Sequence, residues 1–182
     1  MTDFIGFPSI ARLSGNHMVV TEKIDGTNAQ IRISEDGQFL VGSRTRWITP
    51  EDDNYGFARW AKEHEEELRA GLGFGSHFGE WWGSGCQRGY GLKNGEKRFS
   101  LFNVGRWKSA PACCHLVPVL YEGQFETSSI DAALEALRTG GSVAAPGFMN
   151  PEGVVIWHAA ARVLFKKTLG GDGHKTDKKA KF

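Results

Sequence analysis

The sequence predicts an α+β fold with mainly antiparallel sheets. Two observations favour this class: short β-branched or alternating runs recur along most of the chain, and only two stretches carry the signals of a helix. The length of 182 residues suits one domain, and no internal repeat or composition break divides the chain. We therefore expect a single domain over residues 1–182, with a basic tail over about residues 172–182.

Seven runs have the length and the residue types of strands. They are Met18 to Glu22, Ala29 to Ser34, Gln38 to Gly42, Arg98 to Val104, Leu116 to Tyr121, Gly153 to His158 and Arg162 to Thr168. The turn signal Glu35-Asp36-Gly37 predicts a hairpin between the second and the third of these runs.

Two helices are expected between the strands. The first covers roughly Asn54 to Arg69; it is acidic, which is typical of a solvated helix, and two glycines follow it. The second covers Ile130 to Arg138, with Ser129 as its N-cap and Gly140 after its end.

The composition excludes several classes of protein. No run of about 18 apolar residues exists, so we expect neither a membrane span nor a membrane partner. The N-terminus lacks a basic region followed by an apolar stretch, so no secretory signal is predicted. Cys86, Cys113 and Cys114 are an odd set, two of them adjacent, which argues against a disulfide framework and favours a cytoplasmic location.

A net charge of +1 hides an uneven distribution of charge. Residues 86–108 carry six basic side chains and one acidic one, and residues 166–182 carry six against two. Both stretches are candidates for a surface that binds an anionic polymer, although solvated lysines explain the end of the chain equally well. The first stretch is our candidate for contacting a nucleic acid backbone.

The segment Glu22-Lys23-Ile24-Asp25-Gly26-Thr27-Asn28 places a lysine at the end of an apolar strand, before a tight turn. One interpretation is a plain hairpin corner with a surface lysine. The other is a lysine nucleophile, because the strand end fixes the reach of the amine and the glycine lets the backbone approach a ligand. A nearby cation, a bound metal or burial would then have to favour the unprotonated amine.

Three further segments carry charged residues next to glycines or at a strand end. Phe78-Gly79-Glu80-Trp81-Trp82-Gly83-Ser84-Gly85-Cys86-Gln87 surrounds a glutamate with glycines and aromatic residues. Pro151-Glu152-Gly153-Val154-Val155 sets a second glutamate before an apolar strand, and the last predicted strand ends in Lys166 and Lys167. Each segment alone is also explained by ordinary packing, so their order along the chain carries the information.

In this order, the segments resemble the motifs of the covalent nucleotidyltransferases, the superfamily of ATP-dependent ligases and mRNA capping enzymes. The resemblance runs from about Thr21 to Thr168 and implies a nucleotidyltransferase (ATP-grasp-like) fold. In that fold, two mainly antiparallel sheets flanked by helices enclose a nucleotide groove.

Three details resemble one branch of this superfamily, the RNA ligases of the phage double-strand-sealing type. DNA ligases and capping enzymes usually have arginine where this chain has Asn28. Gly83-Ser84-Gly85-Cys86-Gln87 is similar to a Gly-x-Gly-x-Gln segment of those RNA ligases. Arg98-Phe99-Ser100-Leu101-Phe102-Asn103 is similar to their aromatic motif, which implies that Phe102 stacks on adenine.

The resemblance implies the catalytic roles. Lys23 would attack the α-phosphate of ATP and form a lysyl-AMP phosphoramidate, and Lys166 would contact that phosphate. Glu152 and Glu80 would bind Mg²⁺ or Mn²⁺, since hard cations prefer carboxylate oxygens. The residue like Glu80 is also tied to the ribose hydroxyls in the family.

The remaining nucleotide-binding roles are implied in the same way. Glu22 would lie beside the adenine, and Asn28 near the α-phosphate. Arg44 resembles a motif arginine that serves a phosphate or the ribose, although Arg46 can stand in the same register. The related ligases have Lys-x-Lys in the last motif; with Lys166 in the first place, the second falls on Thr168 and Lys167 lies between them. Strand neighbours point to opposite faces, so we expect Lys166 inward, and Lys167 outward or brought in by a bulge.

The resulting expectation is an ATP-dependent RNA ligase confined to its adenylyltransferase domain. Only 14 residues follow Thr168, so neither an OB fold nor a helical C-terminal domain is expected. The partners would be nicked or single-stranded RNA ends with a 5′-phosphate and a 3′-hydroxyl, as in phage RNA repair, and a protein that supplies end binding. The alternatives are a DNA ligase, a capping-type enzyme, or a non-catalytic module that binds RNA ends or nucleotides.

Overall fold

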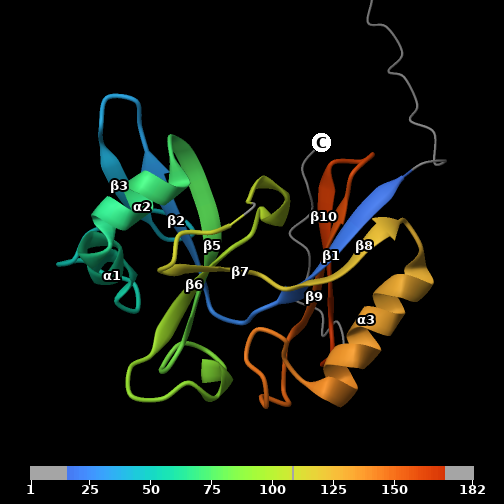
Figure 1. The fold of residues 1–182 in the computed structure, drawn as a ribbon. Coiled ribbons are helices and arrows are strands. Elements are labelled where there is room, and N and C mark those ends of the chain that lie inside the picture. Colours follow the sequence, from blue (N-terminus) through green and yellow to red (C-terminus); the bar gives the residue numbers. More distant parts are fainter. Residues whose placement is uncertain (1–15, 108, 171–182) are drawn as a thin grey trace, which may run out of the picture.

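A computed structural model describes residues 16–107 and 109–170 of the chain. Two sheets form its framework (Figure 1). The four-stranded sheet has the order β10-β9-β1-β8, with β1 at His17–Lys23, β8 at Val119–Gln124, β9 at Gly153–His158 and β10 at Val163–Thr168. All of its strand pairs are antiparallel.

The six-stranded sheet has the order β4-β3-β2-β5-β6-β7. Its strands are β2 (Thr27–Ile33), β3 (Phe39–Gly42), β4 (Trp47–Ile48), β5 (Gly75–Gly83), β6 (Lys97–Leu101) and β7 (Cys114–Leu116). Only the β6–β7 pair is parallel. The α+β class with two mainly antiparallel sheets is therefore confirmed, and the predicted hairpin connects β2 and β3.

Helices cover one face of each sheet. α1 (Phe57–Glu63) and α2 (Glu65–Leu72) lie on the six-stranded sheet, and α3 (Thr127–Gly140) lies on the four-stranded sheet (Figure 1). Two short 3₁₀ turns, η1 (Gly89–Gly91) and η2 (Val104–Arg106), complete the described elements. Within residues 16–107 and 109–170, no helix has the length and apolar character needed to span a membrane.

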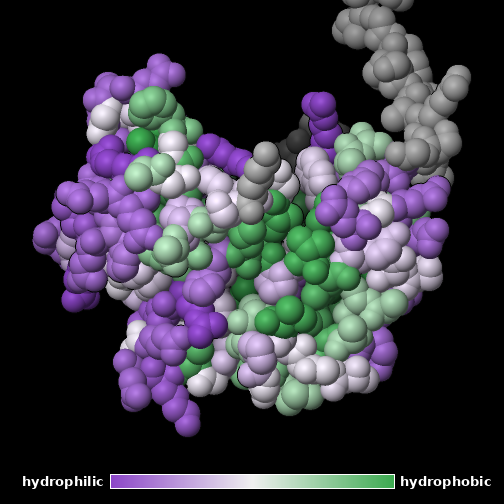
Figure 2. Space-filling model, viewed as in Figure 1, coloured by the Kyte–Doolittle hydropathy of each residue, from purple (hydrophilic) through white to green (hydrophobic). Residues whose placement is uncertain are grey.

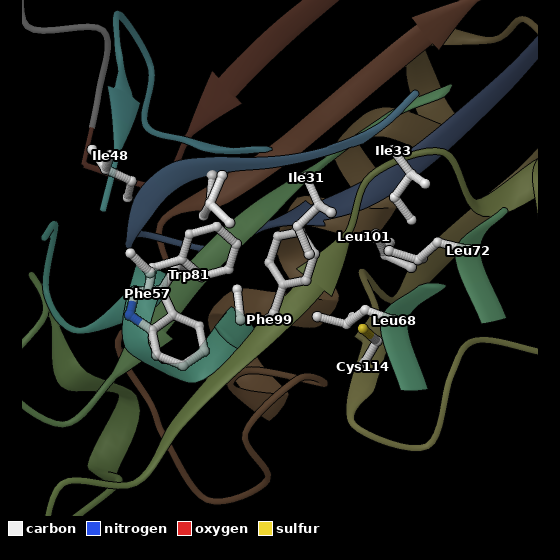
Figure 3. Close-up of a cluster of buried hydrophobic side chains, with 14 residues drawn as sticks. Ile31, Ile33, Ile48, Phe57, Leu68, Leu72, Trp81, Phe99, Leu101 and Cys114 are labelled. Atoms are coloured by element: carbon white, nitrogen blue, oxygen red, sulfur yellow. The ribbon is translucent and has the colours of Figure 1, made fainter. Parts of the chain in front are cut away.

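The larger core lies between α1, α2 and the six-stranded sheet. Phe57 of α1 packs against Trp81 and Phe99, with ring centroids 5.3 and 5.0 Å away. Figure 3 shows Leu68 and Leu72 of α2 approaching the same sheet face. Alternate residues of β2 are buried on this face. The residues between them point to the opposite face, which no described helix covers.

The four-stranded sheet also packs one face against a helix. Its strands bury Met18, Val20, Val154 and Ile156 against Ala133, Leu134 and Leu137 of α3. A third apolar cluster, formed by Ile24, Trp82, Tyr90, Val117 and Ala145, joins elements of both halves. Each sheet therefore has one face packed under helices, and the other face is available for a site.

Several predicted boundaries were wrong for identifiable reasons. The run from Leu116 to Tyr121 is two strands in different sheets, because Pro118 stands between β7 and β8. The first helix is broken at His64, whose Nδ1 lies 2.8 Å from the Trp60 carbonyl oxygen. β5 was missed altogether. It carries three glycines, and a Cβ on Gly79 would come within 2.5 Å of the Phe99 ring.

We predict that Leu68→Ala destabilises the protein by about 3 kcal/mol, because it empties a fully buried position under the six-stranded sheet. Urea unfolding measures the change. The matched control is Leu164→Ala on β10, which is 65% exposed and should cost well under about 1 kcal/mol. Equal losses in the two variants would contradict this assignment of the core.

Candidate active site

The register of β1 and β9 brings Lys23 and Glu152 together. Lys23 is the last residue of β1 and lies directly opposite Gly153, the first residue of β9. The ammonium Nζ of Lys23 is 2.6 Å from Oε2 of Glu152, and both side chains are partly accessible to solvent. Gly153 is required here because a Cβ would lie 2.2 Å from the carbonyl oxygen of Lys167 on β10. The sequence pair Glu-Gly thus supplies a carboxylate and the space for close packing of the strands.

The two lysines of β10 point to opposite faces of the four-stranded sheet. Lys166 lies opposite Val155, which in turn lies opposite Thr21, so Lys166 shares the face of Lys23. Lys167 lies on the α3 face, where its Nζ is 2.5 Å from Oδ1 of Asp131. The inward placement of Lys166 agrees with the sequence analysis. Of the two expected placements of Lys167, the structure has the outward one, because no bulge turns its side chain toward Lys23; its nucleotide-binding role stays a prediction.

Glu80 supplies a buried carboxylate from the other sheet. It lies on β5 opposite Asn28, whose amide Nδ2 donates to Oε2 at 3.3 Å, and the backbone N–H of Gly26 donates to Oε1 at 3.0 Å. Burial raises the pKa of Glu80 to about 7; the charge of Lys23 opposes this shift and that of Glu152 adds to it. Lys23 and Glu152 of the predicted site are therefore close enough to Glu80 for their charges to affect it, and Asn28 is hydrogen-bonded to it.

The turn after Lys23 is packed tightly against β5. A Cβ on Gly26 would lie 2.4 Å from the carbonyl oxygen of Trp81 and 2.7 Å from Cβ of Trp82. The glycine of the Asp-Gly pair is therefore needed for close approach, and this approach lets the Gly26 amide reach Glu80. The turn fixes the distance between the nucleophile candidate and the second carboxylate.

Glu22 is placed differently from Lys23. It points to the α3 face of β1, is 1% exposed, and accepts hydrogen bonds from Ser142 Oγ at 2.5 Å and from the amides of Val143 and Ala144 at 2.9 Å. Its side chain thus anchors the loop that follows α3. The expected role of Glu22 beside the adenine stays a prediction.

Phe102 lies on the same side as Glu80. It follows the last residue of β6, its backbone N–H donates to the carbonyl oxygen of Phe78 at 3.0 Å, and its ring is 40% exposed. The register of β5 and β6 therefore places it opposite Phe78, two pairs beyond Glu80 and Ser100. This position is accessible for stacking on a base, and its role with adenine stays a prediction.

The two arginines between β3 and β4 differ in their partners. Both nitrogens of the Arg46 guanidinium fork contact the carboxylate of Asp52, the Nη2–Oδ1 distance being 2.9 Å. Arg44 is exposed and has no ion-pair partner among the residues that the structure describes. Arg44 is therefore the one of the two with a guanidinium available to a phosphate.

The sequence analysis missed the residues that hold the site together. Arg88 donates from Nε to Asp25 at 2.8 Å, and from Nη1 to the carbonyl oxygens of Asn150 at 3.0 Å and Pro151 at 3.2 Å. The hydroxyl of Tyr90 accepts the backbone N–H of Asp25 at 2.9 Å. Arg88 thus joins the turn after Lys23 to the residues before Glu152. The glycine-rich sequence was the available signal, since Gln87 and Tyr90 both have positive φ.

The predicted basic surface over residues 86–108 is not a continuous surface of free cations. Besides Arg88, Arg98 pairs with Glu96 at 2.7 Å, and Arg106 donates to the carbonyl oxygens of Leu72 and Phe74. Three of the six basic residues of this stretch are therefore used within the fold. Position 108 lies outside the described residues.

The donor set fits a hard divalent cation that keeps most of its water. In the described part of the chain, no cluster of three or more histidine, cysteine or acidic side chains is arranged to bind a metal. Two carboxylates are candidates: Glu80 on β5, and Glu152 just before β9, whose charge adds to the raised pKa of Glu80. Mg²⁺ and Mn²⁺ accept carboxylate oxygens, and Mg²⁺ typically uses only one or two of them.

The chain matches the model of a known protein family. The family model described as RNA ligase matches residues 16–168, and the chain belongs to the RNA ligase family. A comparison with curated protein sequences gave no match. The family match spans β1 to β10 and includes Lys23, Glu80, Glu152 and Lys166.

Solved structures of Naegleria gruberi RNA ligase have a similar fold. A variant with AMP and Mn is 20% identical with a TM-score of 0.60, and the match covers 86% of this chain and 50% of that one. A second variant, with ATP and Mn, is 19% identical with a TM-score of 0.57, covering 85% and 50%. The ligase with PPi is 20% identical with a TM-score of 0.60, covering 86% and 50%. The chain spans about half the length of these structures.

We predict a specific pH dependence from Glu80. Between pH 4.5 and about 7, the folded protein keeps a proton on Glu80 that the unfolded chain has released, so the contribution of Glu80 to stability falls as the pH rises. Relative to Glu80→Gln, the wild-type free energy of unfolding should fall by about 3 kcal/mol across this window. Urea unfolding in EDTA measures it.

The control for this prediction is Glu66→Gln on the exposed surface of α2. Its difference from the wild type should be nearly constant over the same pH range. A constant difference for Glu80→Gln as well would show that burial does not raise the pKa of that carboxyl.

Proposed function

We propose that the chain is an ATP-dependent RNA ligase that forms a lysyl-AMP intermediate on Lys23. The observation that carries the proposal is the placement of Lys23 beside Glu152, with Lys166 on the same sheet face, in a chain of the RNA ligase family. The related structures that contain ATP, AMP and Mn support ATP and a divalent metal as cofactors.

In the first step, Nζ of Lys23 attacks the α-phosphorus of ATP. The N–P bond forms, the bond to the β-phosphate oxygen breaks, and pyrophosphate leaves. Only an unprotonated amine is a nucleophile, so Nζ of Lys23 gives up a proton to solvent and leaves its contact with Glu152 before it attacks. Lys166 stabilises the negative charge on the phosphate from the same face.

Other groups of the chain orient the nucleotide. Arg44 contacts a phosphate or the ribose, Asn28 lies near the α-phosphate, and Phe102 stacks on the adenine. Glu80 and Glu152 would hold the metal, which would neutralise phosphate charge and favour departure of the pyrophosphate. Because Glu80 has a pKa of about 7, metal binding at lower pH must first displace its proton.

The later steps join RNA ends. AMP passes from Lys23 to a 5′-phosphate, and a 3′-hydroxyl then attacks the activated phosphate and expels AMP. The first step needs only the residues described above, whereas the later steps also need a surface that holds the RNA. A protein partner that supplies part of that surface belongs to the proposal, as does the phage double-strand-sealing type. The three free cysteines support a cytoplasmic location.

Intact mass spectrometry tests the first step. After incubation with ATP and Mg²⁺ or Mn²⁺, we expect the wild type to gain the mass of one AMP and to lose it when pyrophosphate is added. Lys23→Ala should gain nothing, because no amine is left at the end of β1. No adduct with either metal, in a protein shown to bind ATP, would favour a non-catalytic nucleotide-binding module.

The two lysines of β10 provide a matched pair of variants. Lys166→Ala should slow adduct formation by about 100-fold or more, because it removes a cation from the phosphate. Lys167→Ala should change the rate by less than about threefold, since its exposed ion pair with Asp131 faces α3 and is worth little. Quenched time courses measure the rate of adduct formation in both variants. Equal effects would contradict the placement of Lys166 and Lys167 on opposite faces of the sheet.

A further inference from the structure

An exposed aromatic ring lies next to the site on the six-stranded sheet. Phe78 is two residues before Glu80 on β5, so both side chains are on the same sheet face. Its ring is 54% exposed, although two residues further along Glu80 is buried. Phe78 takes part in none of the three apolar clusters of the fold. Its exposure is therefore not explained by packing within the described chain.

A cation extends this face beyond Phe78. Arg32 on β2 lies opposite Ser76 of β5 and diagonal to Phe78, within reach of the same bound molecule. Its Nη1 donates to Ser76 Oγ at 3.2 Å, and its side chain is exposed. No ion pair within residues 16–107 and 109–170 involves Arg32.

The charge of this face favours an anionic ligand. Among the strand residues that share the face in β2, β5 and β6, Glu80 is the only acid, and it is buried. Asp36, in the turn beyond β2, is hydrogen-bonded to Ser34 and Gln38 within that turn. Phe78 is 54% exposed and Arg32 is exposed, so this side of β2 and β5 is accessible to a ligand. Figure 2 shows a notch at the upper edge of the molecule, between its two halves.

We propose that this face binds a single-stranded segment of the RNA, with a base stacked on Phe78 and a phosphate on Arg32. The inference rests on the proposed function, because it names the surface that holds the nucleic acid during end joining. Aromatic rings stack on any base, and a nearby guanidinium attracts the backbone, so the pair binds RNA with little dependence on sequence. The surface starts at Phe78, two residues from Glu80 on the same face, and the reacting end must lie near Glu80.

Binding of a fluorescent, 5′-phosphorylated single-stranded RNA in EDTA tests the proposal without turnover. Phe78→Leu should weaken binding about tenfold, because the leucine is apolar but does not stack. Arg32→Gln should weaken binding and reduce the slope of log K against log salt by about 0.7, the value for one lost phosphate contact on a single strand. In both variants, formation of the lysyl-AMP adduct should depend on the ATP concentration as it does in the wild type.

Two control variants match these changes in chemistry and exposure. Phe165→Leu removes a ring that is 55% exposed on the opposite face of the four-stranded sheet, and Arg138→Gln removes an exposed cation of α3. Neither should alter RNA binding. Thermal unfolding midpoints close to the wild-type value in all four variants exclude a loss of fold as the cause.

Different outcomes separate this inference from the proposed function. Unchanged RNA binding in Phe78→Leu and Arg32→Gln, or equal losses in the controls, would overturn the inference alone. A raised KM for ATP with unchanged RNA binding would also overturn it and assign Phe78 to the nucleotide pocket. Failure of the wild type to form the adduct, together with the expected losses in RNA binding, would reject the ligase but support the RNA surface.

Discussion

The site depends on the register in which β9 pairs with β1. This register sets Gly153 opposite Lys23 and so places the Glu152 carboxylate 2.6 Å from the amine. Side chains alternate along a strand, so a slip of one residue would send Lys23 to the α3 face and bring Glu22 to the site. The buried contacts of β1 and β9 with α3 resist such a slip, because it would move apolar side chains out of that core.

In each sheet, one face is packed and stabilises the fold, and the other face carries residues of the candidate site. Helices cover one face of each sheet, and the polar groups of the site lie on the other faces. Close contact at Gly26 brings the turn after β1 against β5 of the other sheet, and close contact at Gly153 packs β9 against β10; at both positions a side chain would collide with backbone atoms. Arg88 adds hydrogen bonds between the turn after Lys23 and the residues before Glu152. The pairing of β1 with β9 therefore holds Lys23 on one side and the packed turn holds it on the other, while its amine stays partly accessible.

Local sequence patterns predicted much of the fold and the site residues next to strand ends, such as Lys23 and Glu152. β9 was predicted with its observed bounds, and the alternation along β10 separated Lys166 from Lys167. β5 escaped notice because its glycines weaken the local strand signal while serving contacts with β6. The roles of Arg88 and Glu22 could not be predicted, because their partners are 62 to 63 and 120 to 122 residues away in the chain.

The sequence by itself determined the α+β class, the order of the charged motifs and the glycines that accompany them. These features are local: they follow from side-chain alternation, turn chemistry and residue type. Only the tertiary structure decided which charged groups meet and which are used within the fold. It buried Glu80 enough to raise its pKa to about 7, turned Glu22 and Lys167 away, and left Phe78 and Arg32 exposed. Such outcomes depend on desolvation and on contacts between distant segments, and no local pattern encodes them.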